Sequence, residues 1–391
     1  MSRRRICVVT GSRADYGHLF WLMRALADDS RVDFRLVVTG MHLSPEFGST
    51  WREIADDGFE IDARIDTQVS GDTAVATAKS IGLGVIGFAD AFARLQPDLV
   101  VLLGDRFESF AAAQAAMTAL IPIAHIHGGE LTEGAIDEAM RHAMTKMARL
   151  HFTAAEAYRQ RVIQLGEDPS RVFTVGAPGL DHLQHLEPLN GNDLAVEIGL
   201  AVGNAPLFLV TYHPATATGD DPATPMRALI DALDGFPEAR VLITKANADA
   251  GGRTINRIID TYADRRPGRV KAVASLGVRR YLSVMQAAAV VIGNSSSGMV
   301  EAPALGRPTV NLGTRQDGRL RAASVIDCGE TAEEIRKAIA MALDPAFQAR
   351  AAAVEPPYGR GGAAAAIHRI LTSFPLDRLA AKRFHDLPSA G

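Results

Sequence analysis

The sequence predicts an α/β protein built from two doubly wound domains. Short apolar runs of strand length alternate with helical patterns, and this alternation stops near residue 186 and begins again near residue 206. A chain of 391 residues also exceeds one ordinary hydrophobic core, which favours two domains of roughly 150–200 residues. Short continuous apolar strands separated by helices are typical of a parallel sheet covered on both faces.

In the first predicted domain, residues 1–186, six apolar runs are expected to form strands. They are RICVVT, DFRLVVTG, DLVVLLGD, IPIAHIH, HFTA and VFTVGA, and helical segments such as FESFAAAQAAMTAL lie between most of them. Residues 187–205 are rich in Asn, Gly and Pro and carry no strong apolar run. We therefore expect them to form a linker.

The strand pattern returns in the second predicted domain, residues 206–365. Its expected strands are PLFLVTYHP, ARVLITKAN, RVKAVAS, AVVIGNSSSG and PTVNLG, and residues 366–391 are expected to form a closing helix and a tail. Open parallel sheets bind ligands at the carboxyl ends of their strands. The predicted site is therefore a cleft between the two domains, lined by these loops.

Charge and cysteine content narrow the class of protein. With 41 Lys and Arg against 45 Asp and Glu, the net charge is −4, and the absence of a basic block argues against a nucleic-acid partner. The first residues, MSRRRICVVTGSR, resemble a first strand more than a signal peptide. No run reaches the roughly 18 apolar residues of a membrane span. We therefore expect a cytoplasmic protein without a membrane partner. Cys7 and Cys328 are the only cysteines, which argues against a disulfide scaffold.

Three polar loops that follow predicted strands can hold a phosphorylated ligand. TGSRADYG places Arg13 at a strand-to-helix turn, where it can bind an anion, although an ordinary turn explains this loop equally well. GNSSSGMVEAPALG places Ser295 and Ser296 before a helix expected to begin near Met299; the alternative is a plain serine cap. KANADAGGR adds Asn247, or is a glycine-rich surface loop.

Acidic and basic residues follow other predicted strands. Asp105 directly follows DLVVLLG, at the carboxyl end of a predicted strand. This is the position expected of a site carboxylate or of a helix cap. Asp105, Glu130, Asp137 and Arg141 are expected on one rim of the first domain, where clustering can raise the pKa of a carboxylate. His213 ends a strand of the second domain, as an acid/base group or a structural histidine.

A metal site is the alternative explanation of HIHGGE. His125 and His127 are two apart on the predicted strand and would share a face. No third ligand has a convincing spacing and HExxH is absent, so hydrogen-bonded histidines are favoured and no metal is predicted.

Taken together, these motifs resemble a known family. TGSRADYG, GDRFE, HIHGGELTEGAIDEAMRHAMTK, HPAT, NADAGGR and GNSSSGMVEAPALGRPTVNLGTRQDGR follow one another between Thr10 and Arg319, as in the hydrolysing UDP-N-acetylglucosamine 2-epimerases. The resemblance implies a glycosyltransferase-B-like fold of two Rossmann-like domains, with the C-terminal helix packing back on the first. It also implies cleavage of UDP-N-acetylglucosamine into UDP and N-acetylmannosamine, through elimination to 2-acetamidoglucal and rehydration, without a cofactor. HGGE in place of the EAG of non-hydrolysing members favours the hydrolysing branch.

The resemblance also implies residue roles. The family's acid/base carboxylates fall on Asp105, Glu130 and Asp137, and its His-Pro histidine falls on His213. Three arginines match positions that contact the sugar nucleotide or orient carboxylates: Arg13, Arg106 and Arg141. The positions that match the nucleotide side are Asn247, Ser295, Ser296, Glu301 and Arg315, with the serines on phosphates and Glu301 on ribose. A homodimer or homotetramer is implied as well.

The same motifs are compatible with other substrates and functions. Stretches such as VTGMHLSPEFG look at least as close to enzymes acting on UDP- or GDP-linked N,N'-diacetylbacillosamine in the legionaminic acid pathway. A B-type glycosyltransferase shares the fold, since fold does not fix function. A non-catalytic nucleotide-sugar sensor is the third alternative.

Overall fold

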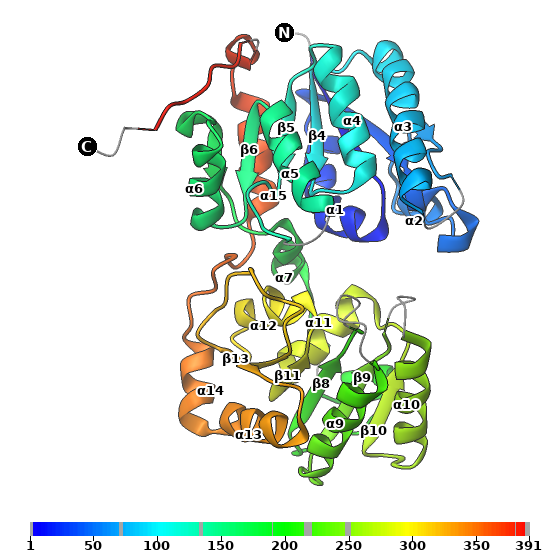
Figure 1. The fold of residues 1–391 in the computed structure, drawn as a ribbon, viewed down its shortest axis with the longest axis vertical. Helices are drawn as coiled ribbons and strands as arrows, with labels where there is room; N and C mark the ends of the chain where they lie inside the picture. The colour runs from blue at the N-terminus through cyan, green and yellow to red at the C-terminus, as the bar shows by residue number, and fades with distance from the viewer. Residues whose placement is uncertain are drawn as a thin grey trace. The chain divides into compact units, whose positions relative to one another are not determined.

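The computed structural model describes residues 3–69, 73–132, 136–189, 191–214, 221–246, 252–379 and 381–387. The chain divides into two compact units, one of residues 1–181 with 361–391 and the other of residues 182–360. Each unit has its own parallel sheet with helices on both faces (Figure 1). The predicted α/β class with two doubly wound domains is therefore confirmed.

The sheet of the first unit has seven strands in the order β3-β2-β1-β4-β5-β6-β7, all paired in parallel. The strands are β1 (Arg4–Thr10), β2 (Val32–Thr39), β3 (Ala63–Ile65), β4 (Leu99–Leu103), β5 (Ile123–Ile126), β6 (Leu150–Thr153) and β7 (Val172–Thr174). Six of them are the predicted strands. The three-residue edge strand β3 was not predicted, because ARI is too short to show a pattern.

Helices cover both faces of this sheet because successive strand residues point to opposite sides. Ile6 and Val8 of β1 pack in one core, and Cys7 and Val9 pack in the other. The helices of this unit are α1 (Arg13–Ala27), α2 (Trp51–Asp56), α3 (Ala74–Leu95), α4 (Phe107–Thr118), α5 (Ile136–Met147), α6 (Glu156–Gln164) and α15 (Ala363–Ser373).

The second unit repeats this plan with six parallel strands in the order β10-β9-β8-β11-β12-β13. The strands are β8 (Leu207–Thr211), β9 (Arg240–Thr244), β10 (Val270–Val273), β11 (Val290–Gly293), β12 (Thr309–Leu312) and β13 (Val325–Cys328), the last of which was not predicted. The helices are α7 (His182–His185), α8 (Gly191–Ile198), α9 (Ala223–Asp234), α10 (Gly252–Asp264), α11 (Gly277–Ala287), α12 (Glu301–Ala304), α13 (Ala332–Leu343) and α14 (Pro345–Ala352).

The segment 187–205 is not a plain linker. It contains α8, whose Leu194 and Ile198 are buried with Leu200 in a core beneath the sheet of the second unit. Its Asn and Gly residues suggested a loop, but Leu194 and Ile198 are four apart and share one side of a short helix. The second unit therefore begins near His182.

The C-terminal helix α15 packs on the first unit, as predicted. Ile367 and Leu371 lie in the same core as α1. Its N-terminus is capped by the buried carboxylate of Asp181, which accepts hydrogen bonds from the backbone N–H groups of residues 362, 363 and 364 at 2.5, 2.9 and 2.5 Å. One carboxylate thus satisfies three amides that a helix start leaves without partners.

Among the described residues, α3 is the one helix whose length and composition would allow it to cross a membrane. It carries Lys79, Asp90 and Arg94, and it buries Phe88 and Phe92 against the sheet and α4. This is the burial pattern of a helix that covers a sheet face.

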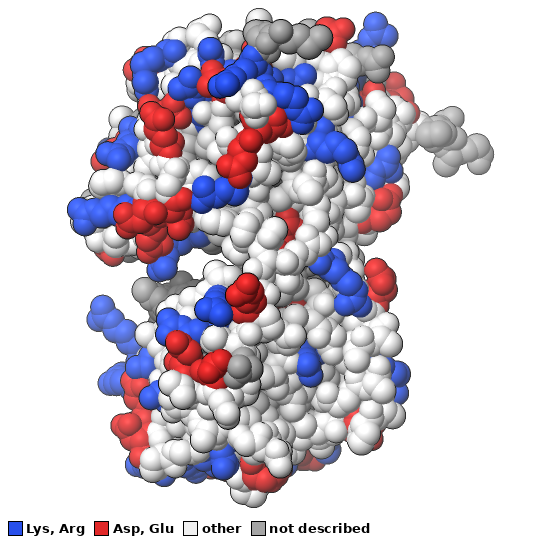
Figure 2. All heavy atoms as spheres, turned by 180° about the vertical axis from the view of Figure 1, so that it is seen from behind, with Lys and Arg blue, Asp and Glu red and all other residues white. Residues whose placement is uncertain are grey.

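Charged residues are interspersed on the surface. On the face shown in Figure 2, Lys and Arg side chains lie among Asp and Glu side chains on both units. This mixture agrees with the nearly balanced composition of the chain.

The Asp181 cap can be tested by substitution. Asp181→Ala leaves three amides without their acceptor, so the free energy of unfolding should fall by about 1–3 kcal/mol, measured by urea denaturation. Glu187→Ala, which removes an exposed carboxylate nearby in sequence, is the control and should leave stability unchanged. Equal stability of the two variants would contradict the assigned role of the cap.

Candidate active site

The polar loops of the first unit meet where the strand order reverses, between β1 and β4. Such a reversal leaves space at the carboxyl ends of the strands, where α/β proteins bind ligands. Gly104, with a φ of +72°, turns the chain out of β4 and places Asp105 and Arg106 at this edge. His127 and Glu130 follow β5, the next strand.

Arg141 brings the predicted acid/base residues together. It lies on α5 and is only 6% exposed. Its Nη2 contacts the carboxylate of Asp105 and donates to Thr132 Oγ1 at 3.0 Å, and its Nη1 lies 3.8 Å from Glu130 Oε2. Asp105, Glu130 and Arg141 therefore form one cluster, which we call the Arg141 cluster, as the predicted rim requires.

Asp137 lies one helical turn before Arg141 on α5. Burial and the neighbouring charge of Asp105 raise the pKa of the Asp137 carboxyl, while Arg106 and Arg141 act in the opposite direction. A raised pKa makes a carboxyl a better proton acceptor, which is a property expected of a general base.

The two histidines of HIHGGE do not share a strand face. The expectation that His125 and His127 lie on one face of a strand, on which the alternative of a metal site depended, is therefore wrong. β5 ends at Ile126, and His127 has a φ of +65°, a left-handed conformation that is uncommon outside glycine. This turn directs Nδ1 of His127 to the Glu130 carboxylate. Nothing in the described ranges brings three His, Cys, Asp or Glu side chains into a metal-binding group.

His125 is buried and holds two elements together. Its Nε2 donates to Gly104 O at 2.7 Å, and its Nδ1 lies 3.2 Å from Thr145 Oγ1 of α5. Burial lowers the pKa of His125 to about 3, so its ring is neutral. His125 thus links α5 to the turn that carries Asp105.

A second group of buried acids adjoins the site and was not predicted. Arg106 donates to the Glu108 carboxylate at 3.2 and 3.0 Å, and Glu108 is 1% exposed. Asp15 accepts a hydrogen bond from Gly11 N at 3.3 Å, and burial raises its pKa to about 6 against the charge of Arg106. Glu108 lies within the GDRFES stretch. Its place in the first turn of a buried helix is the sequence feature that could have predicted its burial.

Arg13 does not join this group. Its side chain is 68% exposed and pairs with Glu53 at 3.4 Å. It is the first residue of α1, whose start is capped by Ser12 accepting from Asp15 N at 3.3 Å. The expected contact of Arg13 with an anion stays a prediction.

A pocket of about 470 Å³ opens at Phe107, the residue that follows Arg106. Its walls are the segment 43–47, which follows β2, residues 66–69 after β3, Thr77 and Ser80 of α3, and Phe107. The lining combines apolar side chains such as Leu43 and Phe47 with hydroxyl and amide groups such as Ser44 and Gln68. This mixture suits a small substituent that has both a methyl and an amide group.

In the second unit, Asn294 fixes the backbone of His213. Asn294 Oδ1 accepts from His213 N at 2.8 Å, and Asn294 Nδ2 donates to His213 O at 2.8 Å. The two residues follow β8 and β11, between which the strand order of this sheet reverses. Gly293 before Asn294 has a φ of +132°, and a Cβ there would lie 1.9 Å from Thr211 O, so only glycine fits.

The remaining predicted ligand residues of this unit surround Asn294. Ser295 caps a 3₁₀ turn at residues 296–298, and Ser296 is exposed. Arg315 Nη1 donates to Asn294 O at 3.0 Å. Burial raises the pKa of Glu301, against the charge of Arg319.

The helix that follows the serines differs from the expectation. α12 begins at Glu301 rather than near Met299 and has four residues, so the serines lie on a turn and not at the start of a long helix. Asn247 lies outside the described residues.

Comparison with known proteins identifies relatives over most of the chain. The profile of a family described as UDP-N-acetylglucosamine 2-epimerase matches residues 24–372. The GDP/UDP-N,N'-diacetylbacillosamine 2-epimerase (hydrolyzing) of Campylobacter jejuni is 39% identical over 327 residues, which are 84% of this chain and 85% of that protein. The UDP-N,N'-diacetylbacillosamine 2-epimerase (hydrolyzing) of Legionella pneumophila is 34% identical over 95% of this chain and 97% of that protein.

A solved structure has the same fold. The UDP-GlcNAc 2-epimerase from Neisseria meningitidis, determined with UDP-GlcNAc bound, superposes with a TM-score of 0.75 at 18% identity and covers 94% of this chain and 99% of that one. At this identity the likeness concerns the fold, which is the glycosyltransferase-B-like arrangement expected from the sequence.

The buried Asp15 carboxyl predicts a pH dependence of stability. Its pKa of about 6 lies above the value of about 3.9 for an unfolded chain, so the folded state binds this proton more tightly. The stabilisation is fully present below pH ~4 and is lost as the pH rises through ~6, on the order of 3 kcal/mol. Asp15→Asn should unfold at higher urea than the wild type at pH 7 and show a smaller change between pH 4 and 6.5. An unchanged pH dependence in the variant would contradict the assignment.

Proposed function

The chain belongs to the UDP-N-acetylglucosamine 2-epimerase family, and on that premise we propose that it is a hydrolysing nucleotide-sugar 2-epimerase. The observation that carries the proposal is the Arg141 cluster, with Asp137 one turn away. Binding alone does not require two carboxylates around one buried arginine beside a third carboxyl whose pKa is raised. Transfer of a proton to and from carbon does.

The proposed reaction has two stages. In the first, a carboxylate removes the proton from C2 of the sugar while the bond from C1 to the diphosphate oxygen breaks, which gives UDP and 2-acetamidoglucal. In the second, water adds to C1 and a proton returns to C2 on the opposite face, which gives the 2-epimer of the free sugar. We assign Asp105, Glu130 and Asp137 to these proton transfers, with Arg141 holding the carboxylates of Asp105 and Glu130 in place.

The second unit is proposed to hold the nucleotide. Ser295 and Ser296 present hydroxyls for phosphate oxygens, and Glu301 is suited to ribose hydroxyls. Arg315, Asn247 and His213 are proposed to lie near the diphosphate, where His213 can stabilise the leaving group. Arg106 is proposed to orient the sugar from the first unit, and Arg13 remains a candidate only if its pair with Glu53 opens.

The substrate is proposed to be a UDP-linked 2-acetamido sugar, and two observations favour N,N'-diacetylbacillosamine over N-acetylglucosamine. The relatives at 39% and 34% identity carry that sugar in their names. The pocket at Phe107 also offers apolar and hydrogen-bonding groups of the kind that a 4-acetamido group and a 6-methyl group require. UDP-N-acetylglucosamine remains the second candidate, since the family profile bears its name.

The reaction is tested by proton NMR in deuterated water, with UDP-N-acetylglucosamine or UDP-2,4-diacetamido-2,4,6-trideoxyglucose and no acceptor. UDP and a manno-configured sugar with deuterium at C2 are the expected products. Asp105→Asn, Glu130→Gln and Asp137→Asn should each lower turnover by about 10²- to 10⁴-fold.

Glu156→Gln is the matched control, because Glu156 is a carboxylate of α6 that bonds Gln160 and Thr174. It should retain wild-type turnover. Near-wild-type turnover in all three site variants would overturn the acid/base assignment, and intact donors with the wild type would favour a glycosyltransferase or a sensor.

The pocket at Phe107 predicts substrate preference. Ser44→Phe should fill it, because Ser44 lines the pocket and its hydroxyl caps no helix. We expect kcat/KM for the diacetamido sugar to fall by at least about 10-fold, the cost of displacing a well-fitted substituent, and that for UDP-N-acetylglucosamine to change much less. Equal losses with both donors would show that the pocket does not select the substituent at C4.

A further inference from the structure

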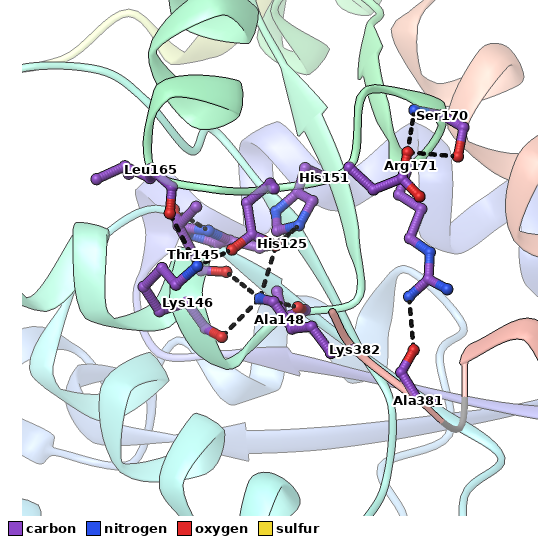
Figure 3. Close-up of polar contacts among 12 residues, drawn as sticks. His125, Thr145, Lys146, Ala148, His151, Leu165, Ser170, Arg171, Ala381 and Lys382 are labelled. Atoms are coloured by element: carbon purple, nitrogen blue, oxygen red, sulfur yellow. Dashed lines mark hydrogen bonds and ion pairs between the residues drawn. The ribbon is translucent and has the colours of Figure 1, made fainter. Parts of the chain in front are cut away.

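The C-terminal tail inserts a lysine beneath the helix that carries the site residues. Lys382 Nζ donates to the backbone carbonyl oxygens of Thr145, Lys146 and Ala148 at 3.3, 2.6 and 2.8 Å. These carbonyls belong to the last turn of α5 and the residue after it. Figure 3 shows the Lys382 side chain pointing from the tail toward these groups.

This arrangement is a helix cap supplied from more than 230 positions away in the sequence. The last carbonyls of a helix have no partner within it and carry partial negative charge. An ammonium group donates hydrogen bonds to these carbonyls and offsets their partial negative charge. The Lys382 side chain is 15% exposed, so water competes little for its hydrogen bonds.

Lys382 is charged in this environment because Glu167 faces it. Glu167 Oε2 lies 2.6 Å from Lys382 Nζ and 2.9 Å from His151 Nε2, and Oε1 lies 2.7 Å from Lys146 Nζ. Although burial acts in the opposite direction, these partners lower the pKa of Glu167 to about 2. Burial lowers the pKa of Lys382 to about 8 against the effect of Glu167, so its ammonium form dominates at neutral pH.

Further contacts hold the tail in place. Arg171 Nη1 donates to Ala381 O at 3.0 Å (Figure 3), and His385 N donates to Gly166 O at 3.0 Å. The Phe384 ring lies 4.9 Å from Lys146 Nζ and fills the space above Gly166, where a Cβ would lie 2.3 Å from the ring. Lys382 is thus presented by a fixed segment and not by a free end.

The capped end of α5 is connected to the candidate site. α5 is 12 residues long, which spans about 18 Å, and its first half carries Asp137 and Arg141. At its last turn, Thr145 contacts His125, which donates to Gly104 O beside Asp105. A shift of the last turn therefore moves Arg141 relative to Asp105.

We propose that Lys382 is a positioning residue, which caps α5 and thereby holds Arg141 and Asp137 in register with Asp105. The catalytic part of this proposal rests on the proposed function, whereas the capping part does not. Because the nucleotide is assigned to other residues, loss of the cap affects turnover more than binding. A displacement of about 1 Å is enough to cost up to about 100-fold in rate.

The first test replaces the ammonium group alone. Lys382→Met keeps most of the stem, and kcat should fall between about 10- and 100-fold while KM changes by less than about twofold. Arg383→Met, which removes the neighbouring exposed cation of the tail, is the matched control and should keep wild-type kcat. Unchanged kcat in Lys382→Met, or a loss confined to KM, would overturn the positioning role.

The second test restores the charge from solution. Lys382→Ala leaves room beside Glu167 in a pocket of about 260 Å³, so n-propylammonium should recover part of kcat, whereas n-propanol of similar size should not. Equal effects of the two molecules would show that the lysine acts through its volume and not as a charged cap.

Hydrogen exchange separates failure of the cap from failure of the proposed reaction. Backbone amides of residues 141–147 should exchange faster in Lys382→Met than in the wild type, with the β4 amides unchanged. Unchanged exchange in α5 would overturn the cap even if the wild type converts the sugar. Faster exchange in a protein that converts no sugar would retain the cap and overturn the proposed function.

Discussion

A buried arginine that must be neutralised organises the first unit. Removing a guanidinium from water costs several kcal/mol unless carboxylates and acceptors surround it, and Arg141 is 6% exposed. Asp105 from the loop after β4 and Glu130 from the loop after β5 meet this requirement. Two loops and one helix are thereby fixed to each other, and two of the carboxylates proposed for proton transfer lie in one place as a result.

At the other end of α5, a second buried cation is also paired with a carboxylate. There the buried cation is Lys382 and its carboxylate is Glu167, which also pairs with Lys146. α5 therefore lies between two charge clusters, and neither cluster is complete without residues distant in the sequence. This explains how a helix with six polar residues among its twelve is held in place beside the candidate site.

Much of this arrangement could be predicted from the sequence, because it depends on local pattern. Apolar runs showed eleven strands, and the rule that parallel strands end at one edge placed Asp105 and Glu130 near Arg141. What could not be predicted depends on tertiary packing. The burial of Asp15 and Glu108 follows from how α1 and α4 cover the sheet, and the contact of Lys382 with α5 follows from the path of the tail.

Errors arose where one turn decides the direction of a side chain. His127 was expected on a strand with His125, but the chain leaves β5 one residue earlier and turns. Arg13 at the start of α1 pairs with Glu53, and its expected contact with an anion stays a prediction. In the second unit, Asn294 and Gly293 fix the backbone of His213 through contacts between two strands. These contacts exist only in the folded sheet, so the sequence pattern does not show them.

The position of α15 has a consequence for how the protein is made. The second unit is continuous in sequence, whereas the core of the first unit includes Ile367 and Leu371, which are synthesised after the whole second unit. Domains generally fold as units during synthesis. The first unit therefore waits, with an apolar groove over α1 still open, until the second has been synthesised in full, and this interval is when the nascent chain most needs protection from aggregation.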